Sequence, residues 1–512
     1  MEASTKIPRP VAVDIEIQPA DQGSLASDGP STVKDDGDMQ RMGKVQEFKR
    51  NLRPMAALTF ASVLQATWEY ILISNYEGLE NGGLPGMFWG YMWTFIGFSF
   101  IIASISEMSS MAPTSGGQYH WVSEFSSPRY QKFLSYITGI SCTLEICWMS
   151  VLAWQAGTAS GSYLTGTIIQ GLISVRNPDY EPQNWQGTLF VFAMVLVIYI
   201  FNVYVSDSME ILSNLLMLLH VTSWAVILII LWAKAPHQSA EAVFATQWEN
   251  FGGGSDAAAH MSEEVKDAGR SVAVAIFWGY LLNGIMAAIL LITYLFATPS
   301  VEDSLNDATG FPFLYVFKQA TSTAGVNGLA AIVLLPVIFS NILFNAATSR
   351  QTFAFARDNG LPFSRWIGKI DKKRQIPINA IALSCTISCA LSLINIGSET
   401  AFNAIISLNV AALMYTYIIS IGCVIYRKIW HPESLPPRRW NMGRWGLAVN
   451  IIGLLYCCFA LFWSLWPSDL PVTLDNFNWS VVIFGGVFII SLAMYLIKGR
   501  KEYSGPAAIV RR

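Results

Sequence analysis

Three ionisable side chains lie inside long apolar runs of this sequence, away from its charged segments. They are Glu69, Glu145 and His220. A charge at the centre of a lipid bilayer costs at least about 2.5–3.5 kcal/mol, so such a group should face a protein-lined cavity or a partner. We therefore interpret Glu69 as a functional residue. The alternatives are that Glu69 lies near a helix end and reaches the membrane interface, or that it pins two helices together.

The other two ionisable groups each allow two interpretations. Glu145, flanked by Trp148 and Trp154, is either a site residue or a hydrogen-bonding residue between helices. We interpret His220 as a hydrogen-bonded packing histidine rather than a proton carrier, although histidine can titrate near neutral pH. The sequence has no metal, nucleotide or redox motif, and the glycines at 252–254 follow no strand. We expect no cofactor, no metal and no nucleic-acid partner.

The composition is typical of a membrane protein. Of the 512 residues, 53% are hydrophobic and 13% are charged, and the mean hydropathy is +0.41. Soluble domains carry about 25% charged residues. Here the charges are concentrated in the tails and a few loops, which predicts an all-α polytopic membrane protein. The net charge of −3 indicates no partner, and the seven cysteines, all within apolar runs, predict no disulfide framework.

The chain divides into a membrane domain, residues 55–498, and two tails. Residues 1–54 are polar, which predicts a disordered tail, and the basic residues that end it place it in the cytoplasm. Residues 499–512 form a second cytoplasmic tail. We expect no signal peptide, so the first span would act as the insertion signal. A spanning helix needs about 20 apolar residues. Eleven segments qualify: 55–76, 84–106, 133–156, 187–205, 211–233, 272–297, 326–348, 377–396, 401–425, 445–466 and 479–497.

The loop charges indicate that one span is missing. The loop 350–374 is the most basic of the chain and should be cytoplasmic, like the N-terminal tail. Two cytoplasmic regions are separated by an even number of spans, but seven of the segments above precede this loop. The stretch between Lys234 and Arg270 has no apolar run long enough to supply another. We predict a span lost near residues 254–256; the alternatives are a marginal segment that crosses, or a misleading charge pattern.

Four stretches resemble a known family. They are residues 66–69 (ATWE), 106–121 (SEMSSMAPTSGGQYHW), 256–264 (DAAAHMSEE) and 349–362, which ends in AFARDNGLP. With these stretches the chain resembles the amino acid–polyamine–organocation (APC) superfamily, and within it the fungal amino acid/choline group that includes GABA permeases and choline permeases. The resemblance covers residues 55–500.

The resemblance implies a twelve-helix, LeuT-like fold with two inverted five-helix repeats and two further helices, of which the sixth is truncated in this chain. The substrate site would lie at the midplane, where breaks in the first and sixth helices free backbone groups for a carboxylate or an amine. The first break would fall within residues 65–69. Thr67 would meet a substrate carboxylate, and Glu69, with Glu145, an amine or a proton. The substrate-binding candidates are Gln65, Thr67, Trp68, Glu69, Glu145, Asn341 and Asn345.

Asn341 and Asn345 lie at i and i+4 on one helix face, where they would line the cavity or form hydrogen bonds between helices. The resemblance also implies a cytoplasmic gate formed by the basic loop 350–374 and the loop 107–121, in which Pro113 and two glycines interrupt the helix. The gate candidates are Glu107, Gly116, Gly117, Asp256, Glu263, Arg350 and Arg357.

We therefore expect a proton-coupled secondary permease for a small amine or amino acid, such as GABA or choline, in a fungal plasma membrane. The alternative is a nutrient sensor that does not transport, or an inactive truncated isoform. An enzyme is not expected, because the nearest acid–base pair, His120 with Glu124, lies in the loop assigned to the gate. Asn478 starts a glycosylation sequon on the outer side, but it lies so close to the membrane that we do not expect its use.

Overall fold

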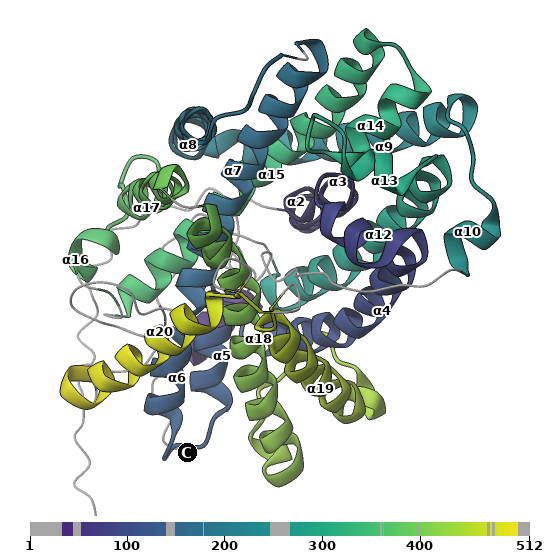
Figure 1. Ribbon diagram of the computed structural model, residues 1–512. Coiled ribbons are helices and arrows are strands. Elements are labelled where there is room, and N and C mark those ends of the chain that lie inside the picture. Colours follow the sequence, from purple (N-terminus) through teal and green to yellow (C-terminus); the bar gives the residue numbers. More distant parts are fainter. Residues whose placement is uncertain are drawn as a thin grey trace, which may run out of the picture. The chain divides into compact units, whose positions relative to one another are not determined.

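The computed structural model describes residues 33–42, 44, 53–139, 149–177, 179–245, 267–358, 361, 363–397, 399–467, 472–473 and 477–499. All of them belong to one of the two units into which the chain divides, Ser31–Arg512. Every regular element in these ranges is a helix (Figure 1), which confirms the all-α prediction.

The structure consists of long helices, joined by short helices and loops. In chain order, the elements that form the main helices are α2 (Pro54–Gln65), α3 (Thr67–Ile73), α4 (Tyr76–Met111), α7 (Met149–Arg176), α8 (Asn184–Tyr204), α9 (Met209–Lys234), α12 (Ala268–Ala297), α15 (Thr323–Arg357), α17 (Ile378–Gly397), α18 (Glu399–Trp430), α19 (Gly446–Ser464) and α20 (Ser480–Met494). The short elements are α1 (Val33–Arg41), α5 (Gln118–Phe125), α6 (Gln131–Gly139), η1 (Ser206–Ser208), α10 (Ala240–Phe244), α13 (Val301–Leu305), α14 (Pro312–Ala320), α16 (Ser364–Ile367), η3 (Pro432–Ser434), η4 (Gly443–Trp445) and η5 (Tyr495–Gly499).

Within the described ranges, ten helices are long and apolar enough to span a membrane. The third predicted span, 133–156, differs most, because α6 and α7 cover its two ends and residues 140–148 lie outside the described part. Helix α7 also continues to Arg176. Small residues interrupt its apolar pattern but allow close packing: a methyl group at Gly157 would lie 2.7 Å from Phe344 of α15. The predicted loss near 254–256 lies outside the described residues.

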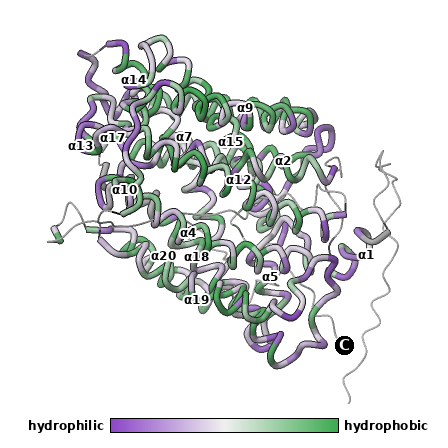
Figure 2. The backbone as a smooth tube through the Cα atoms, turned by 90° about the vertical axis from the view of Figure 1, so that its right-hand side faces the viewer, coloured by the Kyte–Doolittle hydropathy of each residue, from purple (hydrophilic) through white to green (hydrophobic). Residues whose placement is uncertain are grey.

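The long helices pack in two groups. In the first group, α12 lies against α2, α3 and α4; in the second, α7 lies against α8, α15 and α17. The two groups meet where α2 contacts α15, and α18 joins α7 to α19. Figure 2 shows hydrophobic residues along long helices such as α9 and hydrophilic residues mainly in connecting segments. This pattern fits helices that cross a membrane.

Helix α1 lies within the 1–54 tail, which the composition predicts to be disordered. Its residue Met39 and the following Met42 are buried and belong to the same apolar cluster as residues of α2, α4 and α12. The polar composition of the tail hides these two anchors, so the prediction of disorder does not hold for residues 33–42. Residues 1–32 and 500–512 lie outside the described part.

Candidate functional site

The first span is broken at Ala66. Helix α2 ends at Gln65, Ala66 has φ 39° and ψ 43°, and α3 begins at Thr67. This left-handed conformation costs a residue with a Cβ about 1–2 kcal/mol, and Ala66 is fully buried. The break falls within the expected residues 65–69. It leaves backbone groups at the end of α2 and the start of α3 without partners in their own helices.

One freed carbonyl at the break is bound by another helix. Ser340 of α15 donates a hydrogen bond from Oγ to the Leu64 carbonyl over 2.5 Å. In an unbroken helix this carbonyl would accept from the N–H of Trp68. The contact therefore fixes the break against α15, at the junction of the two helix groups.

Glu69 and His220 form a buried pair next to the break. Oε1 of Glu69, on α3, lies 2.6 Å from Nδ1 of His220, on α9. Both side chains have 0% exposure. The other polar atoms, Glu69 Oε2 and His220 Nε2, have no partner among the residues that the structure describes. The pair joins the first span to α9 away from bulk solvent.

Trp68 makes this pair sensitive to the position of a proton. Its indole Nε1 lies 3.1 Å from the same His220 Nδ1, and an indole N–H can only donate. When Nδ1 carries no proton it has a single lone pair, which accepts either from Trp68 or from a protonated Glu69 but not fully from both. If Nδ1 carries the proton and donates a hydrogen bond to Glu69, the Trp68 indole N–H loses its acceptor. The contacts thus allow two arrangements that differ in where one proton lies.

Gln65 and Thr67 flank the break and are half-buried. Gln65 Oε1 is buried and has no partner among the described residues. A methyl group at Gly279 of α12 would lie 3.6 Å from Ser62 Oγ and 3.8 Å from Gln65 Nε2. The last turn of α2 therefore presents polar side chains to α12.

Asn341 and Asn345 differ in their contacts although they share a helix face. Nδ2 of Asn341 donates to the Gly161 carbonyl and to Thr165 Oγ1 on α7, each over 2.9 Å. Asn341 thus has the hydrogen bonds between helices that the sequence offered as the alternative to cavity lining. Asn345 is also fully buried, but neither of its amide atoms has a partner within the described ranges.

Comparison with known proteins identifies the family. A family model described as amino acid permease matches residues 52–488. The chain belongs to the amino acid permease family. It is 26% identical to a choline transporter of Saccharomyces cerevisiae, over 97% of this chain and 88% of that protein. It is 27% identical to an amino-acid permease of Oryza sativa subsp. japonica, over 91% of this chain and 94% of that protein. An amino-acid permease of Arabidopsis thaliana is 25% identical, over 91% and 95%.

These relatives confirm the APC resemblance and show a multi-pass membrane transporter rather than an enzyme.

In this permease, the gate candidate Glu107 is buried where three elements meet. Its Oε2 lies 2.5 Å from Lys428 Nζ of α18, and its Oε1 lies 3.2 Å from Arg438 Nε. Lys428 also donates to Asn450 Oδ1 of α19 over 2.7 Å. Glu107 therefore ties the end of α4 to α18 and to the segment between η3 and η4, and Lys428 ties α18 to α19.

The two gate glycines have backbone and packing requirements that a side chain would not meet. Gly117 precedes α5 with φ 54° and ψ −128°, a conformation that glycine adopts readily. A methyl group at Gly116 would lie 2.9 Å from the Tyr119 ring and hydroxyl. The special geometry expected of this loop is therefore present.

The other gate candidates lie partly outside the described ranges. Arg350 is buried and donates to the Ala346 carbonyl of its own helix over 3.3 Å. Arg357 lies with Cζ 5.6 Å from the Phe353 ring centre. Asp256 and Glu263, like the substrate candidate Glu145, fall in segments that the structure does not describe. The gate role of all these residues stays a prediction.

Asn478 uses its side chain in hydrogen bonds. Its Nδ2 donates to the carbonyls of Ser464 and Trp466, each over 3.0 Å, and its Oδ1 accepts from the Ser480 amide. These contacts would have to break before a glycan could be attached. They add a second reason, besides closeness to the membrane, to expect that the sequon is not used.

Three contacts of the site were not predicted from the sequence. These are the partnership of His220 with Glu69, the Trp68 indole contact, and the support of the break by Ser340. The available signal was the pair of ionisable residues inside apolar spans, since two such groups often pair with each other. Nothing in the spacing along the chain links position 69 to position 220 or 340.

Proposed function

We propose that this permease is a proton-coupled secondary transporter of small amines or amino acids, and that the Glu69–His220 pair holds the coupling proton. The observation that supports it is the 2.6 Å contact between two fully buried ionisable groups beside the break at Ala66. Such groups are costly in a membrane unless they are paired or neutral. Gain or loss of one proton therefore changes how α3 is held against α9.

The substrate site in this proposal lies at the same break. Its backbone groups, the half-buried Gln65 and Thr67, and the unsatisfied amide of Asn345 offer donors and acceptors without net charge. Neutral groups of both kinds suit a small zwitterion or amine. The transport of choline and amino acids by relatives agrees with this size and chemistry. We place the permease in the plasma membrane with both termini in the cytoplasm.

The test is uptake by the full-length protein, purified and reconstituted as the only protein in liposomes. With an inward proton gradient, at least one of labelled GABA, choline or an amino acid mixture should accumulate, and a proton ionophore should abolish the accumulation. Glu302→Gln, which changes an exposed carboxylate of α13, should behave like the wild type. The proposal is wrong if none of these solutes accumulates with the gradient in place.

The alternative is a sensor or an inactive form, which the absence of an apolar run between Lys234 and Arg270 favours. A sensor would bind its ligand without moving it. In the same liposome preparation, a solute that raises the melting temperature of the protein but is never taken up would support the sensor. A solute that is both bound and accumulated would exclude it.

A further inference from the structure

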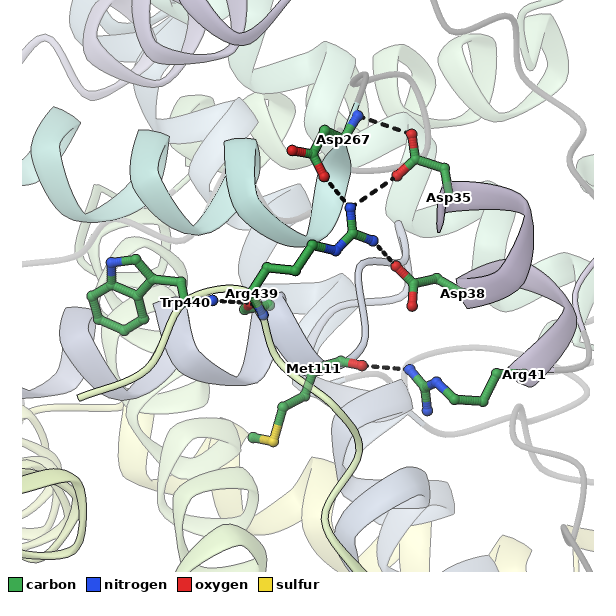
Figure 3. A network of polar contacts seen from close by, with 8 residues as sticks. Asp35, Asp38, Arg41, Met111, Asp267, Arg439 and Trp440 are labelled. Atoms are coloured by element: carbon green, nitrogen blue, oxygen red, sulfur yellow. Dashed lines mark hydrogen bonds and ion pairs between the residues drawn. The ribbon is translucent and has the colours of Figure 1, made fainter. Parts of the chain in front are cut away.

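A short N-terminal strap connects several helix ends on one face of the protein. We define the strap as α1 together with Met42 and Lys44. Figure 3 shows its acidic residues Asp35 and Asp38 beside Arg439, with Asp267 completing the cluster. These four residues come from three distant parts of the chain: the strap, the residue before α12, and the segment between η3 and η4.

Arg439 is the centre of this cluster. It forms ion pairs with Asp38 and Asp267, and its Nη1 lies 3.5 Å from Oδ1 of Asp35. The other carboxylate oxygen of Asp35 accepts from the backbone N–H of Asp267 over 2.9 Å, and Asp35 is 1% exposed. Burial acts to lower the pKa of Arg439, but the three carboxylates outweigh it and raise that pKa. The strap and Asp267, the residue before α12, therefore pair with the same cation, Arg439.

The carboxylates of the strap offset an unfavourable position of the Arg439 guanidinium. A methyl group at Gly269, in the first turn of α12, would lie 3.1 Å from Arg439 Nε and Nη2. The N-terminus of a helix carries a partial positive charge, which repels a guanidinium. The backbone N–H groups of Arg439 and Trp440 both donate to Ser110 Oγ at the end of α4, each over 2.9 Å. Arg439 is thus fixed beside α4 and α12, and the carboxylates compensate for the unfavourable position.

The rest of the strap contacts both helix groups. Arg41 contacts the Met111 carbonyl at the end of α4, and its Nη1 lies 2.9 Å from Glu124 Oε1 of α5. Lys44 forms an ion pair with Asp358, the residue that follows α15. Because α4 and α12 belong to the first helix group and α15 to the second, the strap joins both groups.

We propose that the strap is a clamp that holds this face of the permease closed, and that Arg439 must part from Asp35 and Asp38 before the face can open. The proposal rests on the proposed function, since alternating access requires the two groups to move relative to each other. A contact present only in the closed state shifts the population toward that state. The clamp thereby regulates how often this side of the transporter opens.

Backbone hydrogen exchange of the full-length protein in lipid nanodiscs tests the clamp without any substrate. Asp38→Asn should weaken the ion pair while leaving Asp35 and Asp267 in place. Amides in residues 54–60, at the start of α2, and in residues 112–125 should then exchange about ten-fold faster, because the face opens more often. Arg439→Gln should have a larger effect, because it removes the partner of all three carboxylates.

The control is Glu433→Gln, which changes an exposed carboxylate near Arg439 in sequence and should leave exchange unchanged. If Asp38→Asn speeds exchange only within the strap, the strap is a docked tail and the clamp is refuted. The clamp is also refuted if neither Asp38→Asn nor Arg439→Gln changes exchange in residues 54–60 and 112–125. A protein that takes up no solute would refute the proposed function, whereas the exchange result would still decide whether the strap restrains this face.

Discussion

Glu69 and His220 stabilise each other in a place where neither group would be stable alone. Both are fully buried, and their contact of 2.6 Å links α3 to α9 next to the helix break. Removing one member of a buried pair leaves the other uncompensated. The proposed role of the pair in proton coupling relies on this mutual dependence.

Replacing the histidine alone should be more harmful than replacing both residues. We expect His220→Leu to lower the free energy of unfolding by about 3–5 kcal/mol, since the Glu69 carboxylate stays buried without its partner. The double variant Glu69→Gln with His220→Leu should recover most of that loss. Thermal unfolding of the purified variants in detergent measures both values. Losses that simply add would show that the two side chains do not interact.

At the scale of single elements, the break in the first span is set by backbone geometry as much as by side chains. Ala66 adopts φ 39°, and Ser340 binds the Leu64 carbonyl that the break frees. The composition of the span gives no sign of this break, because alanine is a good helix former. Only the resemblance to the APC superfamily placed it within residues 65–69.

Two alanine-to-glycine substitutions isolate the backbone effect at the break. Ala66→Gly and Ala61→Gly each remove one buried methyl group from the first span. The former should be less destabilising by about 1–2 kcal/mol, because glycine relieves the left-handed strain at Ala66 but weakens the helix at Ala61. Thermal unfolding of the two variants in detergent measures the difference. Equal losses would mean that Ala66 is not strained.

The connection between α13 and α14 gives a pH-dependent prediction outside the spans. Asp307 accepts from the Thr309 amide over 3.0 Å and pairs with Lys318 Nζ at 2.9 Å. Burial acts to raise the pKa of Asp307, but the hydrogen bonds from Thr309 and Lys318 outweigh it and the pKa is lowered. The pKa of Asp307 is lower in the folded protein than in the unfolded chain, where it is about 3.9. The stabilisation by its charge is therefore complete above the unfolded pKa and is lost as the pH falls through the folded pKa.

Asp307→Asn should therefore destabilise the protein by about 1–2 kcal/mol at pH 7. The difference from the wild type should persist to about pH 5 and shrink as the pH falls below about 3.9, once the wild-type carboxylate takes up its proton. Melting temperatures over this pH range give the result. Asp179→Asn, at an exposed carboxylate, serves as the control. A difference that stays constant down to pH 3 would contradict the role given to the Asp307 charge.

For the whole molecule, hydropathy predicted the helical class and most spans, whereas it did not predict features that depend on contacts between residues far apart in the sequence. The all-α class and most spans follow from apolar runs of spanning length. Helix α7 extends beyond its predicted end because close packing against α15 favours small residues that hydropathy does not count. The polar composition of the strap predicts disorder, because its acids gain partners only when Arg439 and Asp267 are brought beside them.

The role of the Glu69–His220 pair in proton coupling is tested by comparing two activities of Glu69→Gln in liposomes that contain only this protein. We predict that the variant still exchanges labelled for unlabelled substrate across the membrane, but no longer accumulates substrate when a proton gradient is imposed. The wild type and Glu302→Gln should do both. Accumulation by Glu69→Gln with the wild-type dependence on the proton gradient would show that the Glu69–His220 pair does not carry the coupling proton.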